Sequence, residues 1–254
     1  VFCSLLFFTL ANKGLRTVLT KNSKSFRALS KTNQTLALIK ISQVLHAVPV
    51  CTLSAALILN DFFYCQRYHF QNAFLGKSEL MDAVLSYSAG YFIYDIPTML
   101  YNNEKTLHCL HHVITVLIQF LCLGYNHGVY FGCSLLLLEA TAPLSVLRWW
   151  LSVTNQKQGG VYFANAMLFS FGFSVYRMSV LTAVIWLTWS QWHLRYANII
   201  AFLFVTFVMP CLCLLNIFWL AAATTGFLRL VKDRAGSARQ AKPMSVGHTP
   251  ASFS

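Results

Sequence analysis

Three histidines lie within five positions of an otherwise apolar stretch, LHCLHHVITVL at residues 107–117. His108, His111 and His112 are spaced i, i+3 and i+4, so a helix would place the three rings on one face. An imidazole titrates near neutral pH, and it can therefore remove a proton, accept an acyl group or bind a metal. The spacing thus predicts a chemical site on this helix.

The metal hypothesis needs more ligands than this stretch supplies. H-x-x-H-H has the shape of a histidine box in membrane di-iron enzymes, where several boxes fill two coordination spheres. The other histidines form no second box; they are His46, His69, His127, His193 and His248. We therefore expect no metal and no cofactor. Acid–base or nucleophilic catalysis is favoured, with Asp95 or Glu139 orienting the imidazole.

The composition is that of a polytopic membrane protein. Of the 254 residues, 57% are hydrophobic and only 10% are charged, which is unusual for a soluble domain of this length. The net charge of +12 comes mainly from Lys and Arg in loops and at the ends. Such a distribution is typical of residues that set membrane orientation and contact anionic lipid headgroups. We expect membrane lipids as partners and no nucleic acid.

Apolar runs predict an all-α fold of about seven transmembrane helices. A helix of roughly 20 residues crosses the hydrocarbon core of a bilayer, and six runs meet this need: 41–60, 83–101, 107–123, 128–147, 161–189 and 197–225. Val1 to Leu10 resembles the remnant of a seventh, cut at its start. Fifteen of the nineteen Lys and Arg residues fall on one side of these spans and three on the other. That side, with the C-terminus, is predicted to be cytosolic.

Polar residues of five spans fall at a similar depth, in the predicted cytosolic half of the membrane. They are His46, Asp95, the pair His111 and His112, Glu139 and Asn216. A charged group in the centre of a membrane helix costs about 2.5 kcal/mol or more, so such residues usually face the bundle interior. This convergence predicts a polar chamber open to the cytosol and capped by apolar packing on the other side.

A purely structural role is the alternative at each position. His46 could pack at the interface, Asp95 could hold a neighbouring helix, and Glu139 could pair with Arg148 or His112. Arg177 lies within a span, where we expect a structural partner or a lipid phosphate contact on the lumenal half.

The histidine pair also carries a family resemblance. His111-His112-Val113-Ile114-Thr115 resembles the H-H-x-x-T motif of the TLC domain, which ceramide synthases and TRAM-type proteins share. The similarity runs from about residue 40 to 230 and includes Leu45-His46-Ala47, GYFIYD at 90–95 and LNIFW at 215–219. It implies a barrel of six helices around a lipid channel, in which the paired histidines take an acyl chain from acyl-CoA.

One stretch distinguishes this chain within the family. LLLLEATAPLSVLRWWL resembles the E-x-[ST]-x-P…R-W pattern of the TLC domain-containing protein 4 type, also called transmembrane protein 56. Ceramide synthases carry His-Asp and a further Asp at this place, whereas this chain has Glu139, Ala140 and Pro143. Two acidic residues of the synthase motif are therefore absent.

These observations lead to two functional hypotheses. In the first, the chain binds acyl lipids and influences the lipid composition of an internal membrane, which we expect to be the endoplasmic reticulum, by acyltransferase chemistry on acyl-CoA. His111, His112, Asp95 and Glu139 would be catalytic, and the substrate would contact His46, Asn216 and Arg148. In the second, the same fold is a non-catalytic lipid sensor, scaffold or trafficking factor.

The expected domain organisation has three parts. Residues 1–27 form a truncated N-terminal transmembrane helix and a basic loop, 28–230 the TLC domain, and 231–254 a disordered cytosolic tail. The tail, from about Gly226, has no apolar period and is rich in Ser, Ala, Lys and Pro, a composition typical of disorder.

Overall fold

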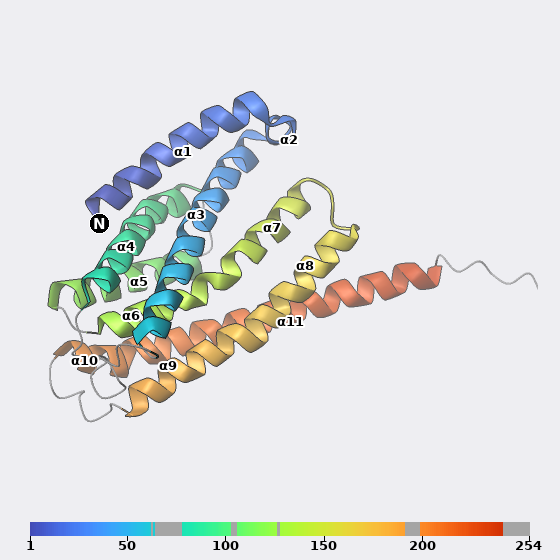
Figure 1. The fold of residues 1–254 in the computed structure, drawn as a ribbon. Coiled ribbons are helices and arrows are strands. Elements are labelled where there is room, and N and C mark those ends of the chain that lie inside the picture. Colours follow the sequence, from blue (N-terminus) through green and yellow to red (C-terminus); the bar gives the residue numbers. More distant parts are fainter. Residues whose placement is uncertain (62, 64–77, 103–105, 126–127, 191–198, 241–254) are drawn as a thin grey trace, which may run out of the picture.

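A computed structural model describes residues 1–61, 63, 78–102, 106–125, 128–190 and 199–240 (Figure 1). All regular structure in these ranges is helical, as the sequence predicted. The first helices are α1 (Phe2–Asn22), α2 (Lys24–Arg27), α3 (Lys31–Asn60), α4 (Glu79–Tyr101) and α5 (Thr106–Tyr125). They are followed by α6 (Val129–Leu136), η2 (Leu137–Thr141), α7 (Ala142–Val153), α8 (Gly160–Phe171), η3 (Gly172–Arg177), α9 (Met178–Ser190), α10 (Ile199–Leu203), η5 (Phe204–Val208) and α11 (Met209–Gln240).

Five helical segments of the described chain are long and apolar enough to cross a membrane. They are Lys31–Asn60, Thr106–Gly124, Val129–Val153, Gly160–Ser190 and Thr206–Gly236. The predicted span at 83–101 does form helix α4, but Ser, Tyr and Asp95 lower its hydropathy and it is not one of the five. α1 is not one of them either. The count of seven therefore stays a prediction.

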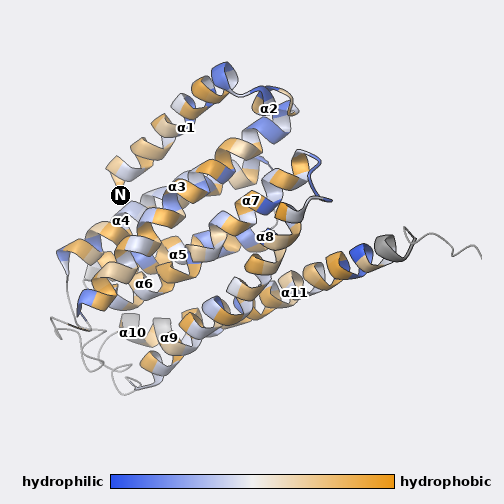
Figure 2. Ribbon diagram, turned by 45° about the vertical axis from the view of Figure 1, so that its right-hand side comes forward, coloured by the Kyte–Doolittle hydropathy of each residue, from blue (hydrophilic) through white to orange (hydrophobic). Residues whose placement is uncertain are grey.

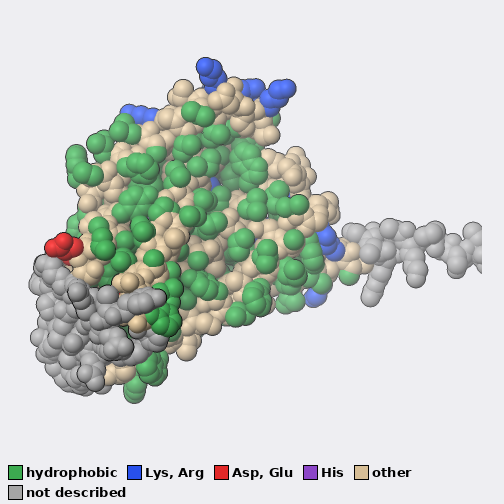
Figure 3. Space-filling view, in the orientation of Figure 1, with side chains coloured by type: hydrophobic (Ala, Val, Ile, Leu, Met, Phe, Trp, Pro, Cys, Tyr) green, Lys and Arg blue, Asp and Glu red, His purple; other side chains and the backbone are tan. Residues whose placement is uncertain are grey.

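Charge and hydropathy divide the bundle into a basic end and an apolar body. Figure 2 shows hydrophilic residues where α1 ends, on α2, at the α7–α8 turn and on the outer part of α11. On the face seen in Figure 3, Lys and Arg side chains lie at this end, and hydrophobic side chains cover the body between it and the opposite end. We call this end, which contains α2 and the α7–α8 turn, the basic end.

Two segments that the sequence placed outside regular structure are helical. Residues 11–40, which lie between the predicted apolar runs at 1–10 and 41–60, belong mostly to α1, α2 and the start of α3, with Ser23 and Ser30 capping the two helices that follow them. The predicted disorder from about Gly226 is wrong as far as Gln240, because α11 continues to that residue. Its Ala, Leu, Lys and Arg residues favour a helix, and Arg234 donates to the carbonyls of Gln158 and Gly159 at 2.9 and 2.8 Å. Residues 241–254 lie outside the described part.

The helices contact one another in an order that surrounds an interior. α3 packs against α4 on one side and against α6, η2 and α7 on the other, and α4 packs against α5. α5 contacts η5, and α11 contacts α8, η3 and α9. The six-helix barrel that the family resemblance implies stays a prediction, with these contacts as its support.

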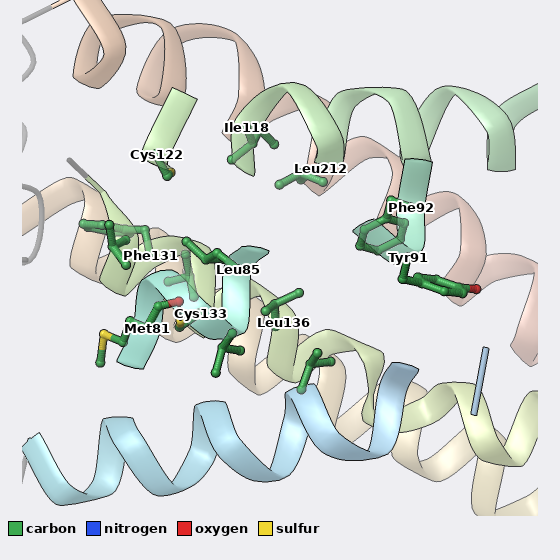
Figure 4. Close-up of a cluster of buried hydrophobic side chains, with 14 of the residues drawn as sticks. Met81, Leu85, Tyr91, Phe92, Ile118, Cys122, Phe131, Cys133, Leu136 and Leu212 are labelled. Carbon is green, nitrogen blue, oxygen red and sulfur yellow. Dashed lines mark hydrogen bonds between the residues drawn. The ribbon is translucent and has the colours of Figure 1, made fainter. Parts of the chain in front are cut away.

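An apolar cluster fills the end of the bundle away from the basic end. It joins α4, α5, α6, α9 and α11, and Figure 4 shows Leu85, Cys133 and Leu136 side by side, with Tyr91 and Phe92 further along α4. Leu85 and Phe131 are completely buried. Because lipid tails are as apolar as these side chains, the cluster stabilises the bundle by van der Waals packing rather than by the hydrophobic effect. This packing closes one end of the interior.

Two irregular turns interrupt the long spans where the site lies. Pro143 has no N–H to donate to the carbonyl of Glu139, so the chain tightens into the 3-10 segment η2 before α7 begins. The carbonyls near the turn accept other donors, including the Tyr176 hydroxyl on Leu137 at 3.1 Å. On the facing span, the π-helical turn η3 ends at Arg177. Together these turns direct Glu139 and Arg177 inward.

Helix α1 is held closely against α4 at a glycine. The Ser4 hydroxyl donates to the carbonyl of Tyr87 at 2.6 Å, and Phe8 is completely buried among the rings of α4. A Cβ atom on Gly90 would lie 2.5 Å from the Cβ of Ser4 and 2.7 Å from the carbonyl oxygen of Val1. The absence of a side chain at Gly90 therefore sets the distance between the two helices.

We predict that Gly90→Ala destabilises the protein by about 1–3 kcal/mol, because the overpacked methyl group must push α1 away. The measurement is thermal unfolding in detergent. Gly14→Ala is the matched control, since a Cβ there has nothing within 4 Å and a glycine-to-alanine change within a helix is favourable. Equal unfolding temperatures for Gly90→Ala and the unmodified chain would contradict this packing.

Candidate functional site

Three of the predicted polar residues, His111, His112 and Glu139, border a cavity of about 430 Å³, which we call the chamber. Its lining includes His108, His111, His112, Glu139, Arg148 and Arg177. Apolar rings complete the wall, from Phe169, Phe173, Phe218 and Trp219. α5, η2, α7, η3 and α11 each supply part of this lining, so segments far apart in sequence meet here.

His112 and Asp95 form a buried pair across α4 and α5. Nδ1 of His112 lies 3.3 Å from Oδ2 of Asp95, and the residues are 7% and 3% exposed. This distance is short enough for an ion pair, but the two groups are not aligned for a hydrogen bond. The Tyr91 hydroxyl donates to the same carboxylate oxygen at 3.2 Å, and the Thr98 hydroxyl donates to the other at 3.0 Å. These donors fix the carboxylate, which favours a proton on Nδ1 and leaves Nε2 of His112 for chemistry.

His111 and Glu139 face each other on the other side of the chamber. Nε2 of His111 lies 4.0 Å from Oε1 of Glu139, so the sequence alternatives that paired Glu139 with Arg148 or His112 are replaced by this contact. Both side chains also border a smaller, mainly apolar cavity of about 40 Å³ that reaches Ile118 and Leu212. The second histidine–carboxylate pair therefore stands between a polar and an apolar space.

Arg177 supplies the buried positive charge of the site. Its Nε donates to Oδ1 of Asn216 at 2.6 Å, and its Nη1 donates to the carbonyl of Leu138 at 2.8 Å and to the Thr141 hydroxyl at 3.3 Å. The guanidinium also lies over the ring of Phe173 at 4.9 Å. The sequence predicted a structural partner, which these contacts confirm, but missed that Arg177 borders the chamber beside Glu139. The signal was an arginine within an apolar span.

His46 and Asn216 are not among the residues that line the chamber. His46 is 0% exposed and stacks on Tyr91, with ring centroids 4.0 Å apart. Asn216 is 1% exposed and is bonded to Arg177. Both residues join helices around the chamber, and the substrate-binding role that the sequence suggested for them stays a prediction.

The sequence prediction did not include Ser88 and Gln119, two buried polar residues that connect helices around the chamber. His46 Nε2 and the Ser88 hydroxyl are 2.9 Å apart, and the Gln119 amide donates to the same hydroxyl at 2.8 Å. This chain of contacts joins α3, α4 and α5. The polar types of Ser88 and Gln119 within apolar spans were the available signal, since buried polar groups in membranes need partners.

Arg148 and His108 lie at the outer part of the chamber. Arg148, predicted to bind substrate, lies over the ring of Phe169 at 4.5 Å and borders both the chamber and a further cavity. His108 is exposed and lies against Trp219, with centroids 5.5 Å apart. In the described ranges, no three His, Cys, Asp or Glu side chains are grouped as a metal site would require.

Comparison with known proteins identifies the family. A family model for the TLC domain matches residues 39–223, a range that contains both histidine–carboxylate pairs, Arg148, Arg177 and Asn216. The chain therefore belongs to the TLC-domain family, and it is a membrane protein of that lipid-related group. No curated protein matches the chain, and no solved structure does.

We predict that Arg177→Ala lowers the free energy of unfolding by about 3–5 kcal/mol, because it removes one partner of a buried polar network. The measurement is the thermal unfolding midpoint in detergent. Arg229→Ala on α11 is the matched control, since Arg229 is exposed. A midpoint for Arg177→Ala equal to that of the control would show that the network does not hold the helices.

Proposed function

We propose that this TLC-domain protein binds an acyl lipid in the chamber and transfers an acyl group from acyl-CoA, thereby changing the lipid composition of an internal membrane, most simply the endoplasmic reticulum. One observation carries the proposal: His112, which is paired with the buried Asp95, lines a chamber that contains Arg148 and Arg177 and adjoins a small apolar cavity at Leu212. The basic end would face the cytosol, where acyl-CoA is found, with the C-terminus on that side.

In the proposed reaction, Nε2 of His112 attacks the carbonyl carbon of the thioester. The carbon–sulfur bond breaks, and coenzyme A leaves as a thiolate. The resulting acyl-imidazole keeps the proton on Nδ1 and is cationic, so the Asp95 carboxylate at 3.3 Å stabilises it. An amine or hydroxyl of the acceptor then attacks the acyl carbon, its proton passes to His111 beside Glu139, and the bond to His112 breaks.

The resemblance to the TLC domain-containing protein 4 type narrows the assignment of this chain within the TLC-domain family. Glu139 stands where ceramide synthases have a histidine, and its pairing with His111 provides an acid–base group on the acceptor side. We propose that the chain is of the TLC domain-containing protein 4 type, with an acceptor that differs from that of the synthases. Ala140 and Pro143 stand where the synthase motif has acidic residues, close to Glu139 in the chamber lining, and this replacement supports a different acceptor.

We predict that His112→Ala lowers acyl transfer from palmitoyl-CoA at least about 100-fold, because it removes the attacking group. The purified chain in phospholipid nanodiscs is assayed for release of free coenzyme A and for labelled acyl lipid by mass spectrometry. The Asp95→Asn variant keeps the His112 imidazole but loses the carboxylate charge beside it, so we expect it to lose much of the acyl-transfer rate. Glu79→Gln, exposed on the same helix as Asp95, is the matched control and should leave the rate unchanged.

A non-catalytic lipid sensor or scaffold is the second candidate, and a specific observation supports it. His46, Arg177 and Asn216 join helices, and His46 and Asn216 are not among the residues that line the chamber, as expected of a purely structural cluster. If His112→Ala lowers the unfolding midpoint as Arg177→Ala does, while acyl transfer is absent from both the unmodified chain and the variant, the sensor is favoured. Acyl transfer by the unmodified chain that is lost in a stable His112→Ala variant excludes it.

A further inference from the structure

A second cavity of about 540 Å³ lies toward the basic end, between α3, α7, α8 and α11. Lys40 and Arg148 contribute its two cationic side chains, and both are only partly exposed. The hydroxyl groups of Ser145, Ser152 and Tyr162 also line it. Nothing in the proposed acyl transfer uses this cavity.

The charges of this lining are unbalanced. No Asp or Glu is among the residues that form it, and the Arg148 guanidinium lies over Phe169 rather than against a carboxylate. Two partly buried cations without a counter-ion are stabilised by a bound anion. A guanidinium and an ammonium group beside hydroxyl donors suit a phosphate, which accepts several charge-assisted hydrogen bonds.

The second cavity adjoins the chamber. Ser145 and Arg148 line both spaces, and they lie one turn apart on α7. If Arg148 binds the charged group of an amphipathic ligand, the apolar part of that ligand would therefore lie beside the chamber rather than in water. Phe227 and Leu230 of α11, with the ring of Trp149, add apolar surface next to the cations. Such a mixture fits an amphipathic ligand better than a free anion.

We propose that Lys40 and Arg148 bind the phosphate of an anionic phospholipid, such as phosphatidic acid, with an acyl chain directed into the chamber. Binding at this site needs neither His112 nor a thioester, so it can be measured apart from acyl transfer even though the acyl chain would enter the same chamber. The phosphate could also come from coenzyme A, whose chemistry is the same at this point. The experiment below separates the two sources.

The test compares lipid binding in the absence of acyl-CoA. The unmodified chain and the variants Lys40→Gln and Arg148→Gln are purified in detergent and titrated with phosphatidic acid or phosphatidylcholine, and bound lipid is counted by native mass spectrometry. Lys31→Gln and Arg229→Gln are the matched controls. Lys31 is exposed on α3, the helix that carries Lys40, and Arg229 is exposed on α11, which also lines the cavity. Parallel titrations use coenzyme A and inorganic phosphate.

We expect phosphatidic acid to bind more tightly than phosphatidylcholine, and each variant to weaken that binding about 10-fold or more, as the loss of a charged hydrogen bond would. The control variants should bind like the unmodified chain. Equal binding of the two lipids, or equal loss in the controls, would overturn the proposal. Coenzyme A binding that depends on Lys40 and Arg148 while phosphatidic acid binding does not would overturn the lipid assignment. If Arg148→Gln fails to fold, Lys40→Gln decides.

Discussion

The structure depends on one constraint: an ionisable side chain within an apolar helix must find a partner on another helix. Leaving such a group unpaired in hydrocarbon costs several kcal/mol, by any scale. Asp95 meets His112, His111 meets Glu139, and Arg177 meets Asn216 and a backbone carbonyl. Each contact joins two segments distant in sequence. The polar groups that form the site therefore also determine which helices are neighbours.

The irregular turns follow from the same constraint. In a regular helix the carbonyls already accept hydrogen bonds from the chain's own N–H groups, so they are less accessible to a guanidinium. Pro143 interrupts this pattern beside Glu139, and the carbonyl of Leu138 then accepts a hydrogen bond from Arg177. The π-helical turn on the facing span ends at that arginine. The loss of regular helical hydrogen bonding at η2 and η3 is thus offset by other hydrogen bonds, and such turns are common at functional sites.

The sequence predicted much of the fold and of the convergence, but not the rotation of each helix. Hydropathy located the helices, and the cost of buried charge indicated that His112, Asp95 and Glu139 would meet. In a membrane, however, a helix is apolar both on the side that faces the bundle interior and on the side that faces lipid. On α3, for example, the apolar residues Leu45, Val48 and Leu53 are exposed, whereas Leu38 and Val50 are buried. The pattern therefore gave no signal that His46 is buried among neighbouring helices and does not line the chamber. The composition of the tail likewise suggested disorder after Gly226, because the anchoring of Arg234 on the carbonyls of Gln158 and Gly159 in the α7–α8 turn is a tertiary contact that composition does not reveal.

The order of the cavities along the bundle gives the interior a direction. The cavity with Lys40 shares Arg148 with the chamber, and the chamber shares His111 and Glu139 with the small apolar cavity beyond it. A ligand that spans these spaces meets cations first, then two histidine–carboxylate pairs, and finally the apolar packing of Figure 4. Because an amphipathic molecule is most stable with its charged group at the cationic end, this gradient alone would place its polar linkage near the histidines. The three histidines of LHCLHHVITVL are then distinct: His108 lies at the exposed edge, whereas His111 and His112 each face a carboxylate where that linkage would lie.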